Sequence, residues 1–88
     1  MEKDRIILDT SAYSAFLRGH EELKLSIQQA DEICMNPVII GELLAGFVMG
    51  KHEKKNRTFL EEFISSPRVS IINIDEETSE RYAVMVSR

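Results

Sequence analysis

Cysteine is nearly absent from this 88-residue sequence, and its scarcity excludes several kinds of protein. Cys34 is the only cysteine, so an internal disulfide is impossible and a structural zinc site, which is built mainly from cysteine and histidine, is disfavoured. Disulfides are typical of oxidising compartments, whereas a single unpaired thiol fits the reducing cytosol. We therefore expect a cytoplasmic protein.

Long hydrophobic runs are also missing. The longest weakly charged stretch covers residues 38–50 and contains Glu42, so it falls short of the roughly 18 apolar residues that suggest a membrane span. Near the N-terminus only Ile6, Ile7 and Leu8 form an apolar run before Asp9, which is too short for a signal peptide. The sequence predicts a soluble protein, neither exported nor inserted in a membrane.

An excess of positive charge is the third feature that the sequence lacks. Its 11 Lys and Arg residues against 15 Asp and Glu residues give a formal net charge of -4, which argues against binding nucleic acid through bulk positive charge. Contact with a polyanion would need a local basic patch or a bound cation. Hydrophobic residues make up 43% of the chain and charged residues 30%, which is typical of one small folded domain, here residues 1–88.

Short apolar segments alternate with helical patterns along the chain. Strands are predicted at residues 5–8, 33–37 and 69–74, and helices up to residue 17, around 23–30, from 37 to about 49, around 59–64 and from 75 to the end. The last helix is expected to carry Tyr82, Ala83 and Val86 on one face. This alternation favours an α/β fold with a parallel sheet, in which ligands bind beyond the carboxyl ends of the strands.

Two carboxylates stand just beyond predicted strands. Asp9 follows the first strand directly, and Glu42 lies early in the helix after the second, as the only charged residue between positions 38 and 50. Because the carboxyl ends of parallel strands share one edge of a sheet, the two side chains could converge there. Clustered carboxylate oxygens without His or Cys suit Mg²⁺ or Mn²⁺, and such an ion can activate water at a phosphodiester.

Each carboxylate also has a simpler interpretation. Asp9 would serve as a helix N-cap, and Glu42 would stabilise its helix dipole from an exposed first turn. Against the second interpretation, the helical neighbours of Glu42 are all apolar, namely Val38, Ile39, Ala45, Gly46 and Met49. A carboxylate in such surroundings is expected to reach the end of the sheet or to meet a cation.

Three segments carry a resemblance to a known family. They read Ile-Leu-Asp-Thr-Ser at residues 7–11, Pro-Val-Ile-Ile-Gly-Glu-Leu at residues 37–43 and Ile-Asp-Glu-Glu-Thr at residues 74–78. Together they resemble the PIN-domain nucleases, specifically the toxins of VapBC-type toxin–antitoxin pairs. A haloacid-dehalogenase-like nucleophile motif is disfavoured, because it would place a second Asp where Ser11 stands.

The resemblance implies a three-layer α/β/α PIN-like fold around a parallel sheet. It also implies a Mg²⁺- or Mn²⁺-dependent endoribonuclease site, in which Asp9 and Glu42 are the catalytic and metal-binding residues and Thr10 or Ser11 supports the metal shell. The implied partners are an RNA substrate, an antitoxin that covers hydrophobic helices and blocks the site, and a second toxin subunit.

The chain departs from the family at its C-terminal side. The third acidic position of the family lies after the helix expected to begin near Asp75, which itself is interpreted as a helix cap. We therefore expect an incomplete PIN-like domain with about three strands, weak metal binding and slow or absent catalysis. Loss of the later strands would expose an edge of the central first strand and favour a homodimer or a strand-exchanged oligomer. The alternative function is a non-catalytic module that binds an antitoxin or a second copy of itself.

Two further groups of residues are candidates for contacts with partners. A basic cluster of possible RNA-binding residues, equally interpretable as a solvated connector between helices, comprises Lys51, Lys54, Lys55 and Arg57. An apolar group that fits antitoxin binding, but is more simply interpreted as core, comprises Leu43, Leu44, Phe47 and Val48.

Overall fold

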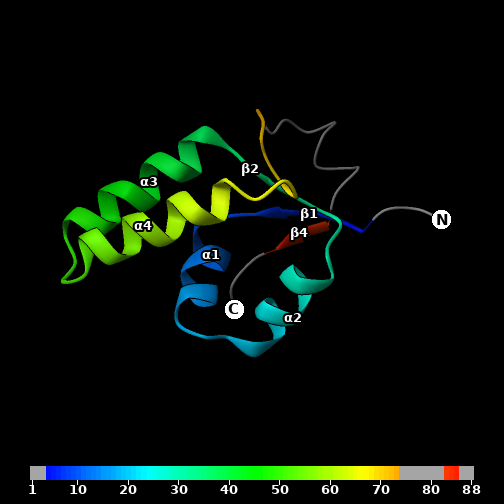
Figure 1. The fold of residues 1–88 in the computed structure, drawn as a ribbon, viewed down its shortest axis with the longest axis horizontal. Helices are drawn as coiled ribbons and strands as arrows, with labels where there is room; N and C mark the ends of the chain where they lie inside the picture. The colour runs from blue at the N-terminus through cyan, green and yellow to red at the C-terminus, as the bar shows by residue number, and fades with distance from the viewer. Residues whose placement is uncertain (1–3, 74–82, 86–88) are drawn as a thin grey trace.

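The computed structural model describes residues 4–73 and 83–85, whose strands form one parallel sheet (Figure 1). The strands are β1 (Arg5–Leu8), β2 (Glu32–Met35), β3 (Val69–Ile71) and β4 (Ala83–Met85), in the order β3-β2-β1-β4. β1 pairs in parallel with β2 on one side and with β4 on the other, and β2 also pairs in parallel with β3. The predicted α/β fold with a parallel sheet is confirmed, with one strand more than the three expected.

β1 and β2 form the buried centre of the sheet. Residues 6–8 and 33–35 are all buried, as is typical of parallel strands that are covered on both faces. At the amino end, Arg5 Nε lies 3.3 Å from Glu32 Oε2, and these two residues are partners in the parallel register. This ion pair marks the end of the sheet opposite to the edge where the candidate residues lie.

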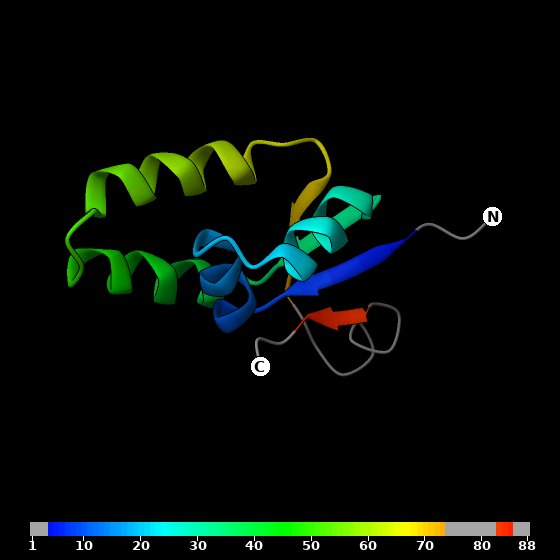
Figure 2. The same cartoon turned by 90° about the horizontal axis from the view of Figure 1, so that it is seen from below.

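Among the described residues, β1 is connected to β2 by α1 (Thr10–Leu17) and α2 (Glu21–Gln29), and β2 is connected to β3 by α3 (Pro37–Val48) and α4 (Glu53–Ile64). Between α1 and α2, Gly19 has φ 85°, a left-handed conformation that glycine adopts without steric cost. α3 and α4 lie side by side as an antiparallel pair that projects beyond the sheet (Figures 1 and 2). Within the described ranges, no helix is long and apolar enough to cross a membrane.

The hydrophobic core lies between the sheet and these helices. Side chains alternate along a strand, so Ile6 and Leu8 of β1 face the same side as Ile33 and Met35 of β2, and all four belong to one buried cluster. The helices contribute the buried residues Ala12, Tyr13, Ala15, Leu23, Ile27, Leu43, Phe47 and Leu60. Leu23 and Ile27 lie four positions apart on α2, which therefore buries one face against the sheet.

The boundary between β2 and α3 is set by its capping residues. β2 ends at Met35, two residues before the predicted end, because Asn36 caps α3: its Oδ1 accepts a hydrogen bond from the Val38 backbone N–H at 2.7 Å. Pro37 follows as the first helical residue, as predicted. β3 ends at Ile71, earlier than the predicted residue 74, which lies outside the described residues.

The helix predicted to carry Tyr82, Ala83 and Val86 is wrong where the structure describes this region. Ala83–Met85 instead form β4, which pairs with β1. The pairing gives this apolar segment a ladder of hydrogen bonds with a strand far away in the sequence, and local periodicity does not reveal such a partner.

β1 therefore has a neighbour on each side, and the exposed edge that was expected to drive strand exchange is not present at β1. The predicted helix start at Asp75 lies outside the described residues.

The basic segment interpreted as a connector is helical for most of its length. α4 begins at Glu53, so Lys54, Lys55 and Arg57 lie in its first two turns. Glu53 Oε2 and Arg57 Nη1 approach to 3.7 Å across one turn. An acidic residue in the first turn and an ion pair between residues four positions apart both favour a helix. The interpretation as a connector rested on the number of charged residues and did not consider their spacing.

Tyr13 carries a buried hydroxyl that finds no hydrogen-bond partner among the described residues. Burial raises the pKa of Tyr13 well above its ordinary value of about 10, so above that pH the unfolded chain releases a proton that the folded chain retains. Stability should therefore fall as the pH rises above about 10.

We expect Tyr13→Phe to stabilise the fold by about 1 kcal/mol at neutral pH and to reduce this alkaline loss of stability. Urea unfolding at several pH values checks both results, and equal alkaline losses in the two proteins would contradict them.

Candidate functional site

The candidate site lies at the carboxyl edge of the sheet, where α1 and α3 begin. Thr10 is the first residue of α1, directly after β1 and Asp9. Glu42 lies in the second turn of α3, which follows β2. The Thr10 hydroxyl Oγ1 donates a hydrogen bond to Glu42 Oε1 at 3.5 Å. The fold therefore brings together two residues that are 32 positions apart in the sequence.

Asp9 adjoins this contact but uses part of its carboxylate to cap α1. Its Oδ1 accepts a hydrogen bond from the Ala12 backbone N–H at 2.7 Å, so the N-cap interpretation is confirmed. A hollow of about 410 Å³ is lined by Thr10 and Glu42 but not by Asp9. Of the two carboxylates that were expected to converge, the hollow thus receives that of Glu42, whereas Asp9 is the residue directly before Thr10 in the sequence and does not line the hollow. Ser11 is exposed and does not line the hollow.

Glu42 is exposed, so its apolar neighbours in the sequence do not bury it, and its carboxylate meets Thr10 at the carboxyl edge of the sheet. Most of its apolar helical neighbours also face solvent: Val38 is 69% exposed and Met49, the C-cap of α3, is 91% exposed, whereas Ile39 packs partly buried against the core. The reason is that α3 turns another face, which includes Leu43 and Phe47, toward the core. The apolar surroundings of Glu42 in the sequence are therefore a solvent-facing surface and not an interior.

The apolar group proposed for antitoxin binding divides between core and surface. Leu43 and Phe47 are 3% and 7% exposed and belong to the core, so the simpler interpretation holds for them. Leu44 is partly buried against the same cluster, whereas Val48 is 62% exposed. Only one of the four residues is thus well placed to contact a partner.

The hollow next to Glu42 has polar walls that sequence reasoning did not identify. Ser14 lines it from α1, Arg18 lines it from the C-cap position of α1, and Asn56 lines it from α4. Thr10, Ser14 and Arg18 are four positions apart, so they lie on one face of α1. This spacing was a signal in the sequence. The contribution of Asn56 had no comparable signal, because the α3–α4 pairing brings it there.

The basic cluster is divided by its position on α4. Lys54 and Lys55 line a neighbouring hollow of about 910 Å³ together with Lys24 and Asn56. Arg57 faces elsewhere, against Glu53, and Lys51 is exposed in the short link before α4. The structure thus places two of the four predicted basic residues near the candidate site.

The donors at the site suit a hard divalent cation only in part. The carboxylates of Asp9 and Glu42 and the hydroxyl of Thr10 are oxygen donors of the kind that Mg²⁺ and Mn²⁺ prefer. Within residues 4–73 and 83–85, however, no group of three or more His, Cys, Asp and Glu side chains is placed to hold a metal ion. An ion held here would therefore keep several of its water ligands.

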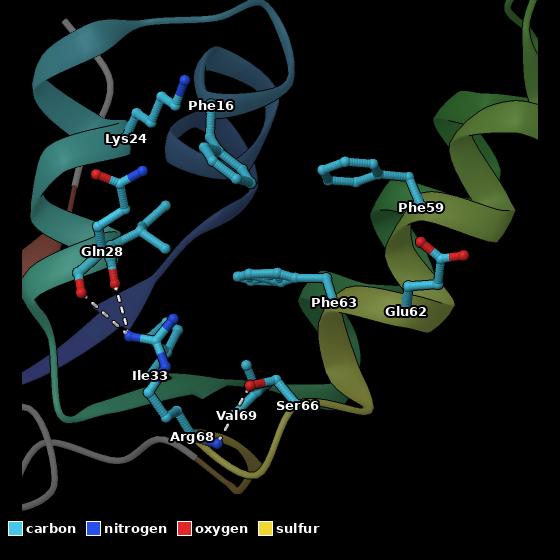
Figure 3. Close-up of a pocket in the computed structure, with 11 residues that line it drawn as sticks. Phe16, Lys24, Gln28, Ile33, Phe59, Glu62, Phe63, Ser66, Arg68 and Val69 are labelled. Atoms are coloured by element: carbon cyan, nitrogen blue, oxygen red, sulfur yellow. Dashed lines mark hydrogen bonds between the residues drawn. The ribbon is translucent and has the colours of Figure 1, made fainter.

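A separate aromatic groove lies between α1, α2 and α4 (Figure 3). Phe16 of α1 faces Phe59 and Phe63 of α4, with ring centroids 6.0 and 5.7 Å away. The groove encloses about 380 Å³. At one end Arg68 donates from Nη1 to the Ala30 carbonyl oxygen at 2.7 Å, which fixes the start of β3 to the end of α2. Phe59 remains 43% exposed, so the groove is open to solvent.

The fold agrees with the comparisons with known proteins. The PIN domain family matches residues 6–88, nearly the whole chain, and the chain therefore belongs to that family. The fold is similar to that in the crystal structure of VapBC2 from Rickettsia felis bound to a DNA fragment from their promoter, with a TM-score of 0.65 and 19% sequence identity. The similarity covers 83% of this chain and 56% of that chain. No curated protein matches this chain.

Proposed function

We propose that this PIN-domain chain is a Mg²⁺- or Mn²⁺-dependent endoribonuclease of the VapC toxin type. The observation that carries the proposal is the contact of Thr10 with Glu42 at 3.5 Å, at the carboxyl edge of the sheet and directly after Asp9. Membership of the PIN domain family and the fold similarity to a VapBC complex support it.

In this proposal the residues of the site have distinct roles. Glu42 and the Asp9 oxygen that does not cap α1 hold the cation, and Thr10 fixes the Glu42 carboxylate through its hydroxyl. Ser11 supports the surrounding water shell. A cation held there would supply the positive charge that a chain of net charge -4 lacks and the Lewis acidity that phosphodiester hydrolysis needs.

The proposed partners follow from the same assignment. The substrate is RNA in the cytoplasm, and its phosphates contact Lys54 and Lys55, which line the hollow next to that of Glu42. An antitoxin inhibits the enzyme, and two toxin subunits form a homodimer. The aromatic groove of Phe16, Phe59 and Phe63 offers the antitoxin an apolar binding surface.

Direct measurement of Mn²⁺ binding tests the metal site. We expect Glu42→Gln to weaken Mn²⁺ binding at least about tenfold, because even residues that only orient a metal ligand contribute that much. Glu61→Gln is the matched control, since it removes the same charge from an exposed position on α4 away from the site. Isothermal titration calorimetry gives both affinities. Equal affinities in the two variants would refute the role of Glu42.

The second candidate function is a non-catalytic interaction module. The open aromatic groove between α1, α2 and α4 favours it, as does the lack of a third carboxylate near Glu42 among the described residues. A folded chain that neither binds Mn²⁺ nor cleaves RNA, yet binds an antitoxin, would establish this function in place of the nuclease.

A further inference from the structure

The hollow that begins at Thr10 and Glu42 continues along α1 away from the sheet. Its α1 wall is formed by Thr10, Ser14 and Arg18 at successive helical turns. Eight residues of α-helix rise about 12 Å, which matches about three nucleotides of a stacked strand at about 3.4 Å each. The hollow is therefore long enough for a short stretch of single-stranded nucleic acid.

Arg18 supplies the positive charge in this hollow. Its side chain is exposed and makes no ion pair within the described parts of the chain, so its donors are available to a ligand. The planar guanidinium can donate two hydrogen bonds to one phosphate. Ser14 and Asn56 add neutral donors on the same hollow. Arg18 thus lies at one end of the α1 wall, and Glu42 lies at the other end, next to Thr10.

The wall formed by α3 leaves room for such a ligand. Gly46 lies one turn after Glu42 and lines the same hollow. A Cβ placed on Gly46 would meet no atom within 4 Å, so the space above it is open. Beyond Leu17 and Asn56, which line both hollows, the surface continues into the hollow that carries Lys54 and Lys55.

We propose that Arg18, assisted by Ser14 and Asn56, binds the phosphate backbone of the RNA strand beside the cleavage site, and that the strand passes over Gly46 toward Lys54 and Lys55. This proposal rests on the proposed nuclease function and adds to it the path of the substrate. It makes Arg18 a binding residue that acts on phosphates irrespective of base sequence.

Binding of a fluorescent 12-nucleotide single-stranded RNA, measured by anisotropy in EDTA, tests the role of Arg18 without metal-dependent cleavage. We expect Arg18→Gln to weaken binding about tenfold, because a charged hydrogen bond is lost. The slope of log affinity against log salt, between about 50 and 200 mM, should fall by about 0.7 for one lost phosphate contact. Arg18→Lys should keep the slope but bind more weakly than the wild type, because it retains the charge and loses the paired donors.

Arg5→Gln is the matched control for the loss of charge, because Arg5 lies at the opposite end of β1. It should leave both the affinity and the salt slope close to those of the wild type. Thermal unfolding of each variant separates an effect on RNA from an effect on stability. Equal salt slopes in Arg18→Gln and Arg5→Gln, or no RNA binding by the wild type, would overturn the proposal.

A pair of substitutions on α3 tests the path independently. Gly46→Glu places a negatively charged side chain in the path and should weaken binding at least about tenfold. Gly41→Glu is the matched control, because it makes the same change on α3 at an exposed glycine that has open space around it and does not line the hollow. Equal RNA affinities in these two variants would contradict a strand that passes over Gly46.

The outcomes also separate this proposal from the nuclease proposal. If Arg18→Gln changes RNA binding but Glu42→Gln changes neither Mn²⁺ binding nor cleavage, the binding path stands and the nuclease assignment fails. If Glu42→Gln abolishes cleavage while Arg18→Gln leaves binding unchanged, the nuclease stands and the path fails.

Discussion

Asp9→Asn is expected to lower the rate of Mn²⁺-dependent RNA cleavage at least about 100-fold, an effect typical of losing a group that acts directly in the reaction. The same substitution should barely change stability. Asp9 Oδ1 accepts the capping hydrogen bond from Ala12 N–H at 2.7 Å, and the asparagine carbonyl oxygen accepts the same bond, since Asn and Asp are comparable N-caps. Cleavage of a labelled RNA and urea unfolding measure the two effects.

Asp9→Ala provides the comparison that separates the two roles of Asp9. It should lose cleavage to the same extent and also lose about 0.5–2 kcal/mol of stability, because the cap is gone. If Asp9→Asn retains the cleavage rate of the wild type, Asp9 is a structural cap only. The two substitutions together therefore test the functional interpretation of Asp9 against the simpler one.

Leu60→Ala is expected to destabilise the fold by about 2–5 kcal/mol, the cost of removing a buried leucine side chain from a packed core. Leu60 is 1% exposed and is the only fully buried residue of α4. Because small domains are stable by only about 5–15 kcal/mol, this loss is a large part of the total. The midpoint of urea unfolding, followed by circular dichroism, measures it.

Leu25→Ala is the matched control, because it removes the same atoms from a helical leucine that is 54% exposed. Its effect should stay within about 0.5 kcal/mol. Similar unfolding midpoints for the two variants would mean that α4 is not held to the core through Leu60. In that case the positions of Asn56, Lys54 and Lys55 around the candidate site would also be in doubt.

The elements formed by local signals were predicted well from the sequence. The apolar run of β1, the Asp9 cap and the Asn36-Pro37 start of α3 are fixed by neighbouring residues, and the structure has all three. β4 was missed because its pairing with β1 joins the two ends of the chain. No pattern within residues 83–85 distinguishes that strand from a helical turn.

The candidate site was predicted in part for a similar reason. The positions of Asp9 and Glu42 after strand ends follow from parallel topology, and the structure brings Glu42 to the residue next to Asp9. The apolar neighbours of Glu42 did not determine its exposure, because such neighbours on a helix indicate burial only if that face meets the core. Asn56 was missed because its place depends on how α4 packs against α3.

The central place of β1 also affects how this protein is made. The ribosome releases β1 first, yet β1 gains its second neighbour only when β4 emerges, roughly 50 residues after β2 and thus about 2–10 s later at ordinary rates of translation. During that interval the nascent polypeptide presents an unpaired apolar edge. Chaperones that shield emerging chains would have their greatest effect on this protein in that window.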